Sequence, residues 1–248
     1  RKRYNKSCEK DRALPFFCCR NAEKEAAGKD NDMIRGVLFD MDGLMFDTER
    51  LALEGWMLAA GKLNIALSEE QIASLRGLLP EVSRQKFIGW FGDGAIYDKG
   101  RDIRKAYVEQ WIEEHGMPVK KGLFELLEYL KEKQIRTAVA TSTNRPAAEH
   151  YWACAGVEPY FDASVCGSEV KQGKPAPDVF LTAAARIGCA PEACLVLEDS
   201  PNGVRAGHAA GCTVAMVPDL DAPDVECRAL CDYVLEDLGQ VIRILEAQ

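Results

Sequence analysis

The sequence predicts an α/β fold, in which helices flank a parallel sheet, with an all-helical insertion after the first strand. Short apolar and β-branched runs of strand length alternate with helical patterns along the chain, as is typical of parallel strands joined by crossover helices. Residues 41–134 separate the first two runs, although a crossover needs only about a dozen residues or slightly more. The excess length predicts an inserted domain.

Five strands and four core helices follow from these patterns. The strands are expected at residues 34–40, 135–141, 162–166, 194–198 and 213–217. The helices are expected at residues 122–133, 146–155, 177–187 and 202–210. Three of the helices are followed by a glycine, at Gly156, Gly188 and Gly211, and glycine readily adopts the left-handed conformation that ends a helix.

The insertion has helical patterns only. Leu51, Trp56 and Met57 recur at helical spacing, the capping-box pattern Ser68-x-x-Gln71 opens a second helix, and Pro80 stands near the start of a third. A fourth helix is expected to end at His115-Gly116. We therefore expect a core of residues 33–47 and 118–248 and a helical cap of residues 48–117. The cap would cover the carboxyl ends of the strands, where open α/β sheets bind ligands.

The composition of the chain limits the classes of partner that the protein is expected to bind. Residues 1–32 mix charges and small residues without a regular period, and we expect them to form a tail. Residues 33–248 carry 22 Lys and Arg against 33 Asp and Glu, an acidic balance that disfavours nucleic acid. No apolar run approaches the roughly 18 residues of a spanning helix, so no membrane partner is expected. The ten cysteines are scattered and include no Cys-x-x-Cys pair, which favours reduced thiols and hence a cytoplasmic protein. We expect the protein to be a monomer.

Acidic residues follow two of the expected strands. Asp40 and Asp42 come directly after the first, and Glu198 and Asp199 end the fourth. Carboxylates at the end of an apolar strand are costly to bury unless a cation is present. Hard oxygen ligands suit Mg²⁺, which commonly takes one or two protein carboxylates and leaves other positions to phosphate. The alternative is a pair of surface turns or helix caps.

Two further segments carry groups that suit an anion. Thr141 and Ser142 follow the second strand and precede a helix, whose N-terminus favours negative charge, although plain helix capping explains them equally well. Lys174 stands in the turn Gly-Lys-Pro-Ala-Pro-Asp, where prolines fix the backbone. A phosphate-binding Walker loop is excluded, because Pro175 occupies the place of the Ser or Thr that binds Mg²⁺. A plain surface lysine is the alternative.

Together these four segments resemble the motifs of the haloacid dehalogenase-like (HAD) hydrolase superfamily. Asp40-Met-Asp-Gly-Leu-Met-Phe-Asp-Thr-Glu49 is similar to its first motif, Thr141 to its second, Lys174 to its third and Glu198-Asp-Ser-Pro-Asn-Gly203 to its fourth. The resemblance covers about residues 33–220. A cap inserted just after the first motif is similar to the β-phosphoglucomutase-like subfamily, and the resemblance implies a Rossmann-like, three-layer core. Most such proteins are phosphatases.

The resemblance also implies roles for these residues. Asp40 would be the nucleophile that forms an aspartyl-phosphate, and Asp42 the general acid and base. Mg²⁺ would be held by the Asp40 carboxylate, the Asp42 main-chain carbonyl and Asp199, with Glu198 as a ligand or a neighbour of the ligands. Phosphate-binding groups would come from Thr141, Ser142 and Lys174. The expected partner is a small phosphorylated metabolite: a sugar, polyol or nucleoside phosphate.

Three alternatives are weighed against a phosphatase. Mutases of the subfamily carry a histidine in the first cap helix, and Ala52 occupies that position here, which favours hydrolysis. A dehalogenase proper needs neither Asp42 nor a metal-binding Asp199. A non-catalytic sugar-phosphate-binding protein could keep the fold, but every motif position is intact.

Overall fold

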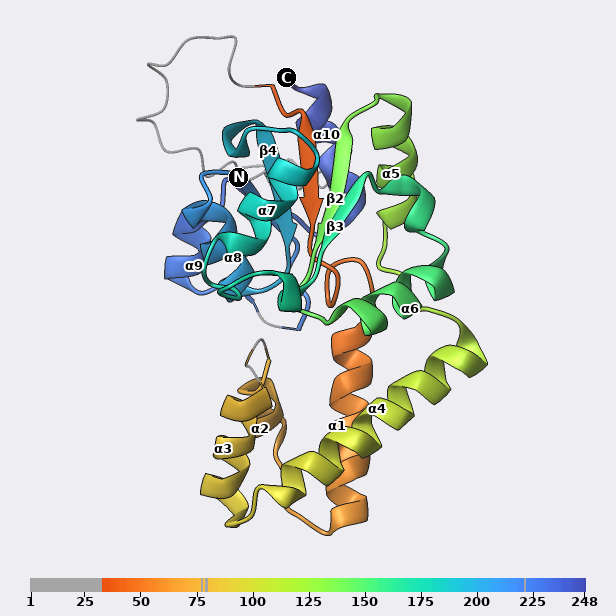
Figure 1. Ribbon diagram of the computed structural model, residues 1–248, viewed down its shortest axis with the longest axis vertical. Coiled ribbons are helices and arrows are strands. Elements are labelled where there is room, and N and C mark those ends of the chain that lie inside the picture. The colour runs from red at the N-terminus through yellow and green to blue at the C-terminus, as the bar shows by residue number, and fades with distance from the viewer. Residues whose placement is uncertain (1–32, 77, 79, 221) are drawn as a thin grey trace, which may run out of the picture.

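The computed structural model describes residues 33–76, 78, 80–220 and 222–248, and its centre is a parallel sheet. Six strands lie in the order β3-β2-β1-β4-β5-β6. Their bounds are β1 Gly36–Phe39, β2 Arg136–Ala140, β3 Ala163–Val165, β4 Cys194–Glu198, β5 Thr213–Met216 and β6 Tyr233–Val234. Figure 1 shows the strands pointing toward the group of helices that follows β1 in sequence.

Helices cover both faces of the sheet, so the core has three layers. One face packs against α5 Leu123–Glu132, α6 Arg145–Ala155 and α10 Val241–Glu246. The other packs against α7 Asp178–Arg186, α8 Pro201–Ala209 and α9 Val225–Leu230. Both faces of strand β1 are buried because helices cover both faces of the sheet. Its side chains alternate between the two faces, with Val37 and Phe39 in the first layer and Leu38 in the second. This double burial explains why its sequence is a continuous apolar run.

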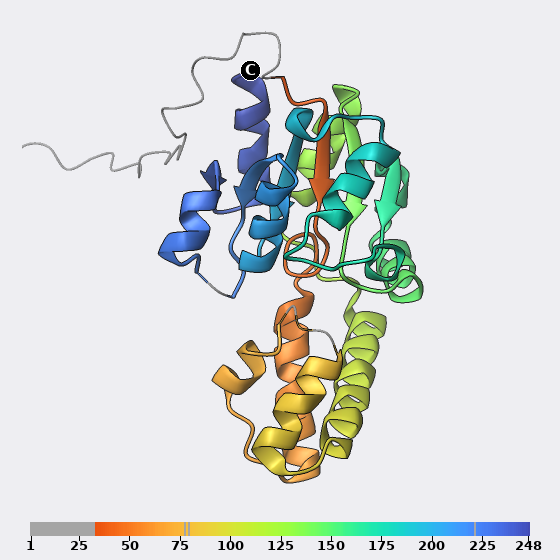
Figure 2. The same ribbon diagram turned by 60° about the vertical axis from the view of Figure 1, so that its left-hand side comes forward.

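The segment after β1 forms four helices, which we call the inserted helices. They are α1 Thr48–Leu63, α2 Glu69–Ala73, α3 Pro80–Phe91 and α4 Ala95–His115. Their outer part has an aromatic core of its own, in which Trp56 stacks on Tyr97 at a ring-centroid distance of 5.9 Å and contacts Phe87 at 5.4 Å. Figure 2 shows them as a separate group joined to the sheet by two chain segments.

Four 3₁₀ helices of three residues each complete the regular structure of the described residues. They lie at Glu158–Tyr160, Gly167–Glu169, Pro191–Ala193 and Leu238–Gln240. The second follows β3 and leads into the loop that carries Lys174. None of the helices among the described residues has the length and apolarity that crossing a membrane requires.

The predicted fold class is confirmed, and each of the five predicted strands has a counterpart. The predicted capping box of α2 also forms, because Gln71 N donates to Ser68 Oγ at 3.2 Å and Ser68 N donates to Gln71 Oε1 at 2.9 Å. The prediction missed β6, α9 and α10, which are short. The predicted tail, residues 1–32, lies outside the described residues.

Candidate active site

The site is built at the carboxyl ends of the two central strands. Strand β1 pairs in parallel with β4, with Phe39 beside Leu197. Asp40 continues this pairing, since its N–H donates to Leu197 O at 3.0 Å. The register therefore sets Asp40 beside Glu198, the last residue of β4, although the two are 158 positions apart in sequence. Two of the predicted acidic segments meet for this reason.

Three buried carboxylates converge at this edge. Ligand oxygens of Asp40, Glu198 and Asp199 all lie within 4.8 Å of one another. The three residues are only 7%, 0% and 9% exposed, respectively. Ionised carboxylates that are this close together and shielded from water repel one another strongly unless positive charge is present. Asp40 and Asp199 are near enough to share one ion, as the sequence interpretation requires.

Lys174 supplies one positive charge. Its Nζ donates to Asp40 Oδ1 and also to Glu198 Oε1, the latter at 2.6 Å, and its side chain is only 6% exposed. Burial opposes the charge, but attraction to Asp40 and Glu198 outweighs it and raises the pKa of Lys174 above its ordinary value. The lysine is thus a permanent cation and not a surface residue.

Glu198 is held by its own loop. Its Oε2 accepts hydrogen bonds from the N–H of Asp199 at 3.0 Å, from the N–H of Ser200 at 2.9 Å and from Ser200 Oγ at 3.0 Å. Ser200 in turn caps α8 by accepting from Gly203 N at 3.1 Å. A Cβ on Gly203 would lie 1.7 Å from Glu198 Oε1, so only glycine lets α8 approach so closely. Both oxygens of Glu198 therefore already accept hydrogen bonds. Glu198 is better placed to contact the residues that would bind a metal ion than to bind the ion itself.

The remaining two carboxylates fit a divalent cation. Burial is the largest influence on the pKa of Asp40, and the pKa is raised to about 8 because the charge of Glu198 adds to burial and together they exceed the attraction of Lys174. The pKa of Asp199 is also raised, by burial first and then by the charges of Glu198 and Asp40. When ionised, the three carboxylates carry more negative charge than the single ammonium group of Lys174 can balance. Oxygen ligands with excess negative charge suit Mg²⁺.

Asp42 lies outside this cluster of three acids, and its carboxylate accepts hydrogen bonds from two hydroxyl groups. Thr48 Oγ1 donates to Asp42 Oδ1 at 2.7 Å, and Thr143 Oγ1 donates to Asp42 Oδ2 at 2.7 Å. Thr48 is the first residue of α1, whereas Thr143 lies in the loop between β2 and α6. The carboxylate of Asp42 is therefore tied both to the inserted helices and to the core.

The two predicted phosphate-binding residues after β2 lie in that same loop. Thr141 is 1% exposed, and its Oγ1 accepts the N–H of Thr143 at 3.0 Å. Ser142 is exposed. Its carbonyl oxygen would lie 2.3 Å from a Cβ on Gly167, so the loop after β3 packs tightly against it. The residue that caps α6 is Asn144, which accepts from Ala147 N at 3.2 Å, and not Thr141 or Ser142, for which capping was the alternative.

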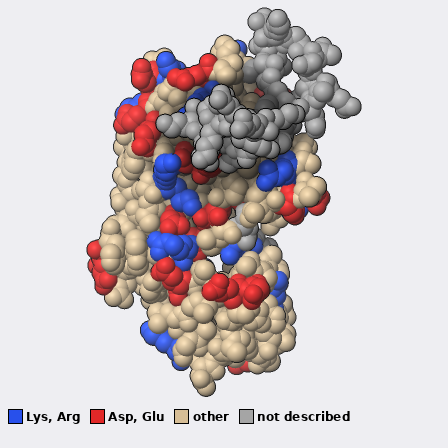
Figure 3. Space-filling model, turned by 180° about the vertical axis from the view of Figure 1, so that it is seen from behind, with Lys and Arg blue, Asp and Glu red and all other residues tan. Residues whose placement is uncertain are grey.

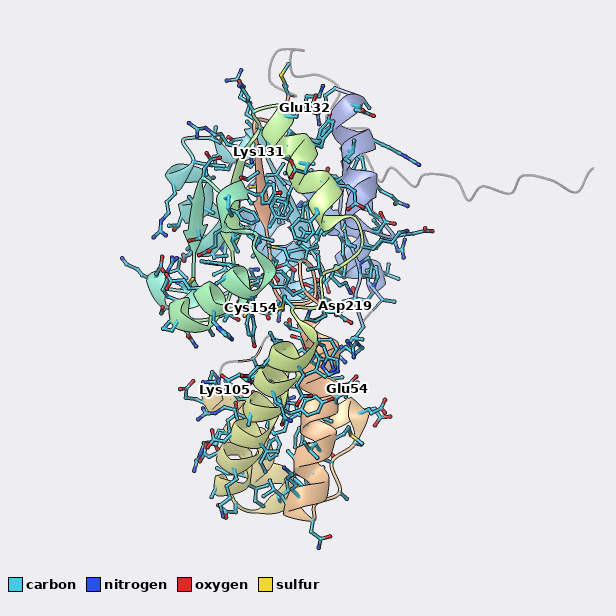
Figure 4. The ribbon with its side chains drawn as sticks, turned by 90° about the vertical axis from the view of Figure 1, so that its right-hand side faces the viewer. Glu54, Lys105, Lys131, Glu132, Cys154 and Asp219 are labelled. Atoms are coloured by element: carbon cyan, nitrogen blue, oxygen red, sulfur yellow. The ribbon has the colours of Figure 1, made fainter. Side chains whose placement is uncertain are left out.

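The structure also shows polar residues that the sequence interpretation missed. The sequence pattern did not single out Thr48 and Thr143 as site residues, because threonine is common near the start of a helix. A second missed feature joins the two segments that connect the inserted helices to the core: Lys120 Nζ donates to Asp219 Oδ1 at 2.6 Å and lies 4.0 Å from Asp47 Oδ1. Figure 4 shows Asp219 at the edge of the core that faces the inserted helices, across from Glu54. Figure 3 shows charged side chains gathered around this junction.

Fold and site define a class: an α/β protein with three buried carboxylates and a lysine at the carboxyl edge of a parallel sheet and a helical insertion facing them. The family model described as haloacid dehalogenase-like hydrolase matches residues 34–211. The chain therefore belongs to the haloacid dehalogenase-like hydrolases, as the motifs predicted, and it is a hydrolase of this family.

Known relatives agree with this assignment. Hexitol phosphatase A of Escherichia coli is 32% identical over 84% of this chain and 93% of its own length. A probable pseudouridine-5'-phosphatase of Drosophila melanogaster is 36% identical over 76% of this chain and 85% of its own. Among solved structures, β-phosphoglucomutase from Clostridium difficile superposes with a TM-score of 0.71 at 22% identity, over 86% of this chain and 96% of its own, and this likeness concerns the fold.

Proposed function

We propose that the protein is a Mg²⁺-dependent phosphatase that hydrolyses a small phosphate monoester through an aspartyl-phosphate on Asp40. The observation that carries this proposal is the position of Lys174 between two buried carboxylates, with Asp199 close to both. Such a centre has an acidic oxygen to attack phosphorus, an ammonium group to meet phosphoryl oxygens and room in its charge balance for a cation.

In the first step, a carboxylate oxygen of Asp40 attacks phosphorus, and the bond to the leaving alcohol oxygen breaks. Lys174 holds Asp40 in place and neutralises part of the negative charge. The hydroxyl of Thr141 already accepts an N–H bond, so its own hydrogen is left to donate to a phosphoryl oxygen. Ser142 lies in the same loop and would contribute through its main-chain N–H. Asp42, as an acid, would give the leaving alcohol its proton.

In the second step, Asp42 takes a proton from water, whose oxygen attacks the phosphorus of the aspartyl-phosphate and regenerates Asp40. Mg²⁺, held by Asp40, the main-chain carbonyl of Asp42 and Asp199, would neutralise charge on the phosphoryl oxygens. Dividing one difficult displacement into two easier ones is the advantage of the covalent route.

A sugar or polyol phosphate is the substrate class that we propose. Relatives named as a hexitol phosphatase and a probable pseudouridine-5'-phosphatase support a small hydroxylated leaving group. The inserted helices, which we propose act as a cap, face the carboxyl edge of the sheet and stand where the leaving group would extend. The cysteines among the described residues are not joined in disulfides, which supports the proposal that the enzyme works in the cytoplasm.

The proposal is tested by phosphate release at pH 7 from p-nitrophenyl phosphate and from a panel of sugar, polyol and nucleoside phosphates. We expect release that stops with a chelator, returns with Mg²⁺ and falls below about 1% in Asp40→Asn. Asp102→Asn, at an exposed position of α4, is the matched control and should match the wild type. Activity that survives chelation would contradict the metal, and conversion of glucose 1-phosphate to glucose 6-phosphate without free phosphate would indicate a mutase instead.

A further inference from the structure

Asp42 must give up and take back a proton at one place in the site, so its carboxylate needs a fixed position. An aspartate side chain has two rotatable bonds, and ordering it has a cost in conformational entropy. Here each carboxylate oxygen accepts one hydroxyl bond of 2.7 Å, from Thr48 on one side and from Thr143 on the other. Two bonds to different oxygens fix the plane of the carboxylate as well as its location.

The two donors differ in what anchors them. Thr48 belongs to the first turn of α1, so its hydroxyl is placed by the inserted helices. Thr143 is placed by the core alone. Its N–H donates to Thr141 Oγ1 at 3.0 Å, and its carbonyl oxygen accepts the N–H of Gly167 at 3.2 Å.

The loop that carries Thr143 has little freedom to move. Gly167 packs so closely on the carbonyl of Ser142 that a Cβ would lie 2.3 Å from that oxygen. Immediately after the loop, Asn144 caps α6. The side chain of threonine is itself stiff, because it branches at Cβ. The hydroxyl of Thr143 is thus a rigid donor, fixed in the frame that also carries Thr141.

We infer that Thr143 is a positioning residue for proton transfer: it holds the Asp42 carboxylate, from the core side, where Asp42 serves the leaving oxygen. This inference rests on the proposed phosphatase function. It predicts a defect that depends on how much the leaving group needs a proton. A merely structural role of Thr143 would instead disturb all substrates alike, through Thr141 and the phosphate-binding loop.

Two aryl phosphates separate these effects, because p-nitrophenolate leaves readily without a proton and phenolate does not. The ratio kcat/KM reports steps up to release of the phenol, which is the half-reaction in which Asp42 acts as an acid. We expect Thr143→Val to lower kcat/KM about tenfold or more for phenyl phosphate and no more than about twofold for p-nitrophenyl phosphate. Thr143→Ser, which keeps the hydroxyl, should restore most of the loss.

Asp42→Asn provides the reference pattern. It should show the same preference for the better leaving group with a larger loss, and adding Thr143→Val to it should cost less than about twofold more, because the residue that Thr143 positions is already gone. Thr143→Ala serves as a second variant should the valine disturb folding. Thr213→Val, at the start of β5 and the opposite end of the sheet, is the matched control and should leave both substrates unaffected.

Equal losses for both substrates, or full additivity with Asp42→Asn, would overturn the inference and leave Thr143 a structural residue. Unchanged kinetics in both Thr143→Val and Thr143→Ala would overturn it too. Failure of the wild-type protein to hydrolyse either aryl phosphate in the presence of Mg²⁺ would instead contradict the proposed function on which the inference rests.

Discussion

Lys174 Nζ donates a hydrogen bond to Glu198 Oε1 at 2.6 Å, and neither side chain is more than 6% exposed. The same ammonium group bonds Asp40, so one lysine from the loop after β3 joins the ends of β1 and β4. Removing one partner of a buried ion pair leaves the other charge buried without compensation. The resulting loss of stability is larger than the net stability that the intact pair contributes.

We expect Lys174→Met to lose activity and stability together. Asp40 and Glu198 would remain buried without a counter-charge, and the free energy of unfolding at pH 7 without metal should fall by about 3 kcal/mol. Phosphate release should fall by about a thousandfold or more, because a phosphoryl-binding charge is lost as well. Urea unfolding and the phosphate-release assay measure the two effects.

Lys171→Met is the matched control for this change. Lys171 is exposed in the same loop, three residues earlier. Removing its charge should leave stability within about 0.5 kcal/mol of the wild type. If Lys174→Met were equally benign, the ion pairs with Asp40 and Glu198 would have no part in holding the site.

Asp199→Asn should stabilise the metal-free protein and abolish its response to Mg²⁺. The raised pKa of Asp199 reflects burial and the nearby charges of Glu198 and Asp40, so an uncharged amide removes repulsion. We expect the wild-type Tm to rise on adding MgCl₂ and the Asp199→Asn Tm to stay constant, from a higher starting value. Asp102→Asn should respond as the wild type does, and a variant at Asp199 that still gains Tm with MgCl₂ would remove this residue from the metal site.

Gly203→Ala should disable the site without removing a charged group. The added methyl would lie 1.7 Å from Glu198 Oε1, so either α8 or the Glu198 side chain must move. We expect a loss of about 2 kcal/mol or more in unfolding free energy and a marked loss of activity. Gly61→Ala provides the contrast: it lies in α1 with nothing within 4 Å of the added Cβ, and should stabilise by about 0.5–1 kcal/mol. Equal behaviour of the two variants would contradict the close packing at Glu198.

The meeting of the acidic groups could be predicted because it follows from topology. Parallel strands end at one edge of the sheet, so residues that follow them, such as Asp40 and Asp199, meet wherever the strands are neighbours. Lys174 needed the family resemblance, because no strand or helix position brings a loop lysine to a given edge. The loop's course from β3 back to β1 decides that contact.

Hydrogen bonds between loops could not be predicted in the same way. Thr143 and Asp42 are 101 positions apart, and their contact depends on loop geometry that no periodicity encodes. The short terminal elements were missed for a different reason: β6 has two residues and α9 has six, too few to show a period. Their burial comes from tertiary packing, as with Cys227 of α9, which is fully buried.

Glu49, in the first turn of α1, makes the stability of the metal-free protein depend on pH. Burial, together with the charge of Asp42, raises its pKa to about 7, whereas a glutamate in the unfolded chain keeps its ordinary pKa of 4.5. Between these two values the folded state keeps a proton that the unfolded state releases. The contribution of Glu49 to the unfolding free energy therefore falls as pH rises from about 4.5 to about 7, and stays low above that.

Glu49→Gln should remove this dependence, because an amide carries no charge at any pH. In the presence of a chelator, we expect the variant to gain about 2 kcal/mol over the wild type between pH 5 and pH 8, with most of the gain below pH 7.5. Urea unfolding at intervals of half a pH unit measures the difference directly. Glu113→Gln, at an exposed position of α4, should show a constant difference across the same range. A difference between Glu49→Gln and the wild type that is equally flat would contradict the raised pKa, because it would show that Glu49 is already ionised in the folded protein at pH 5.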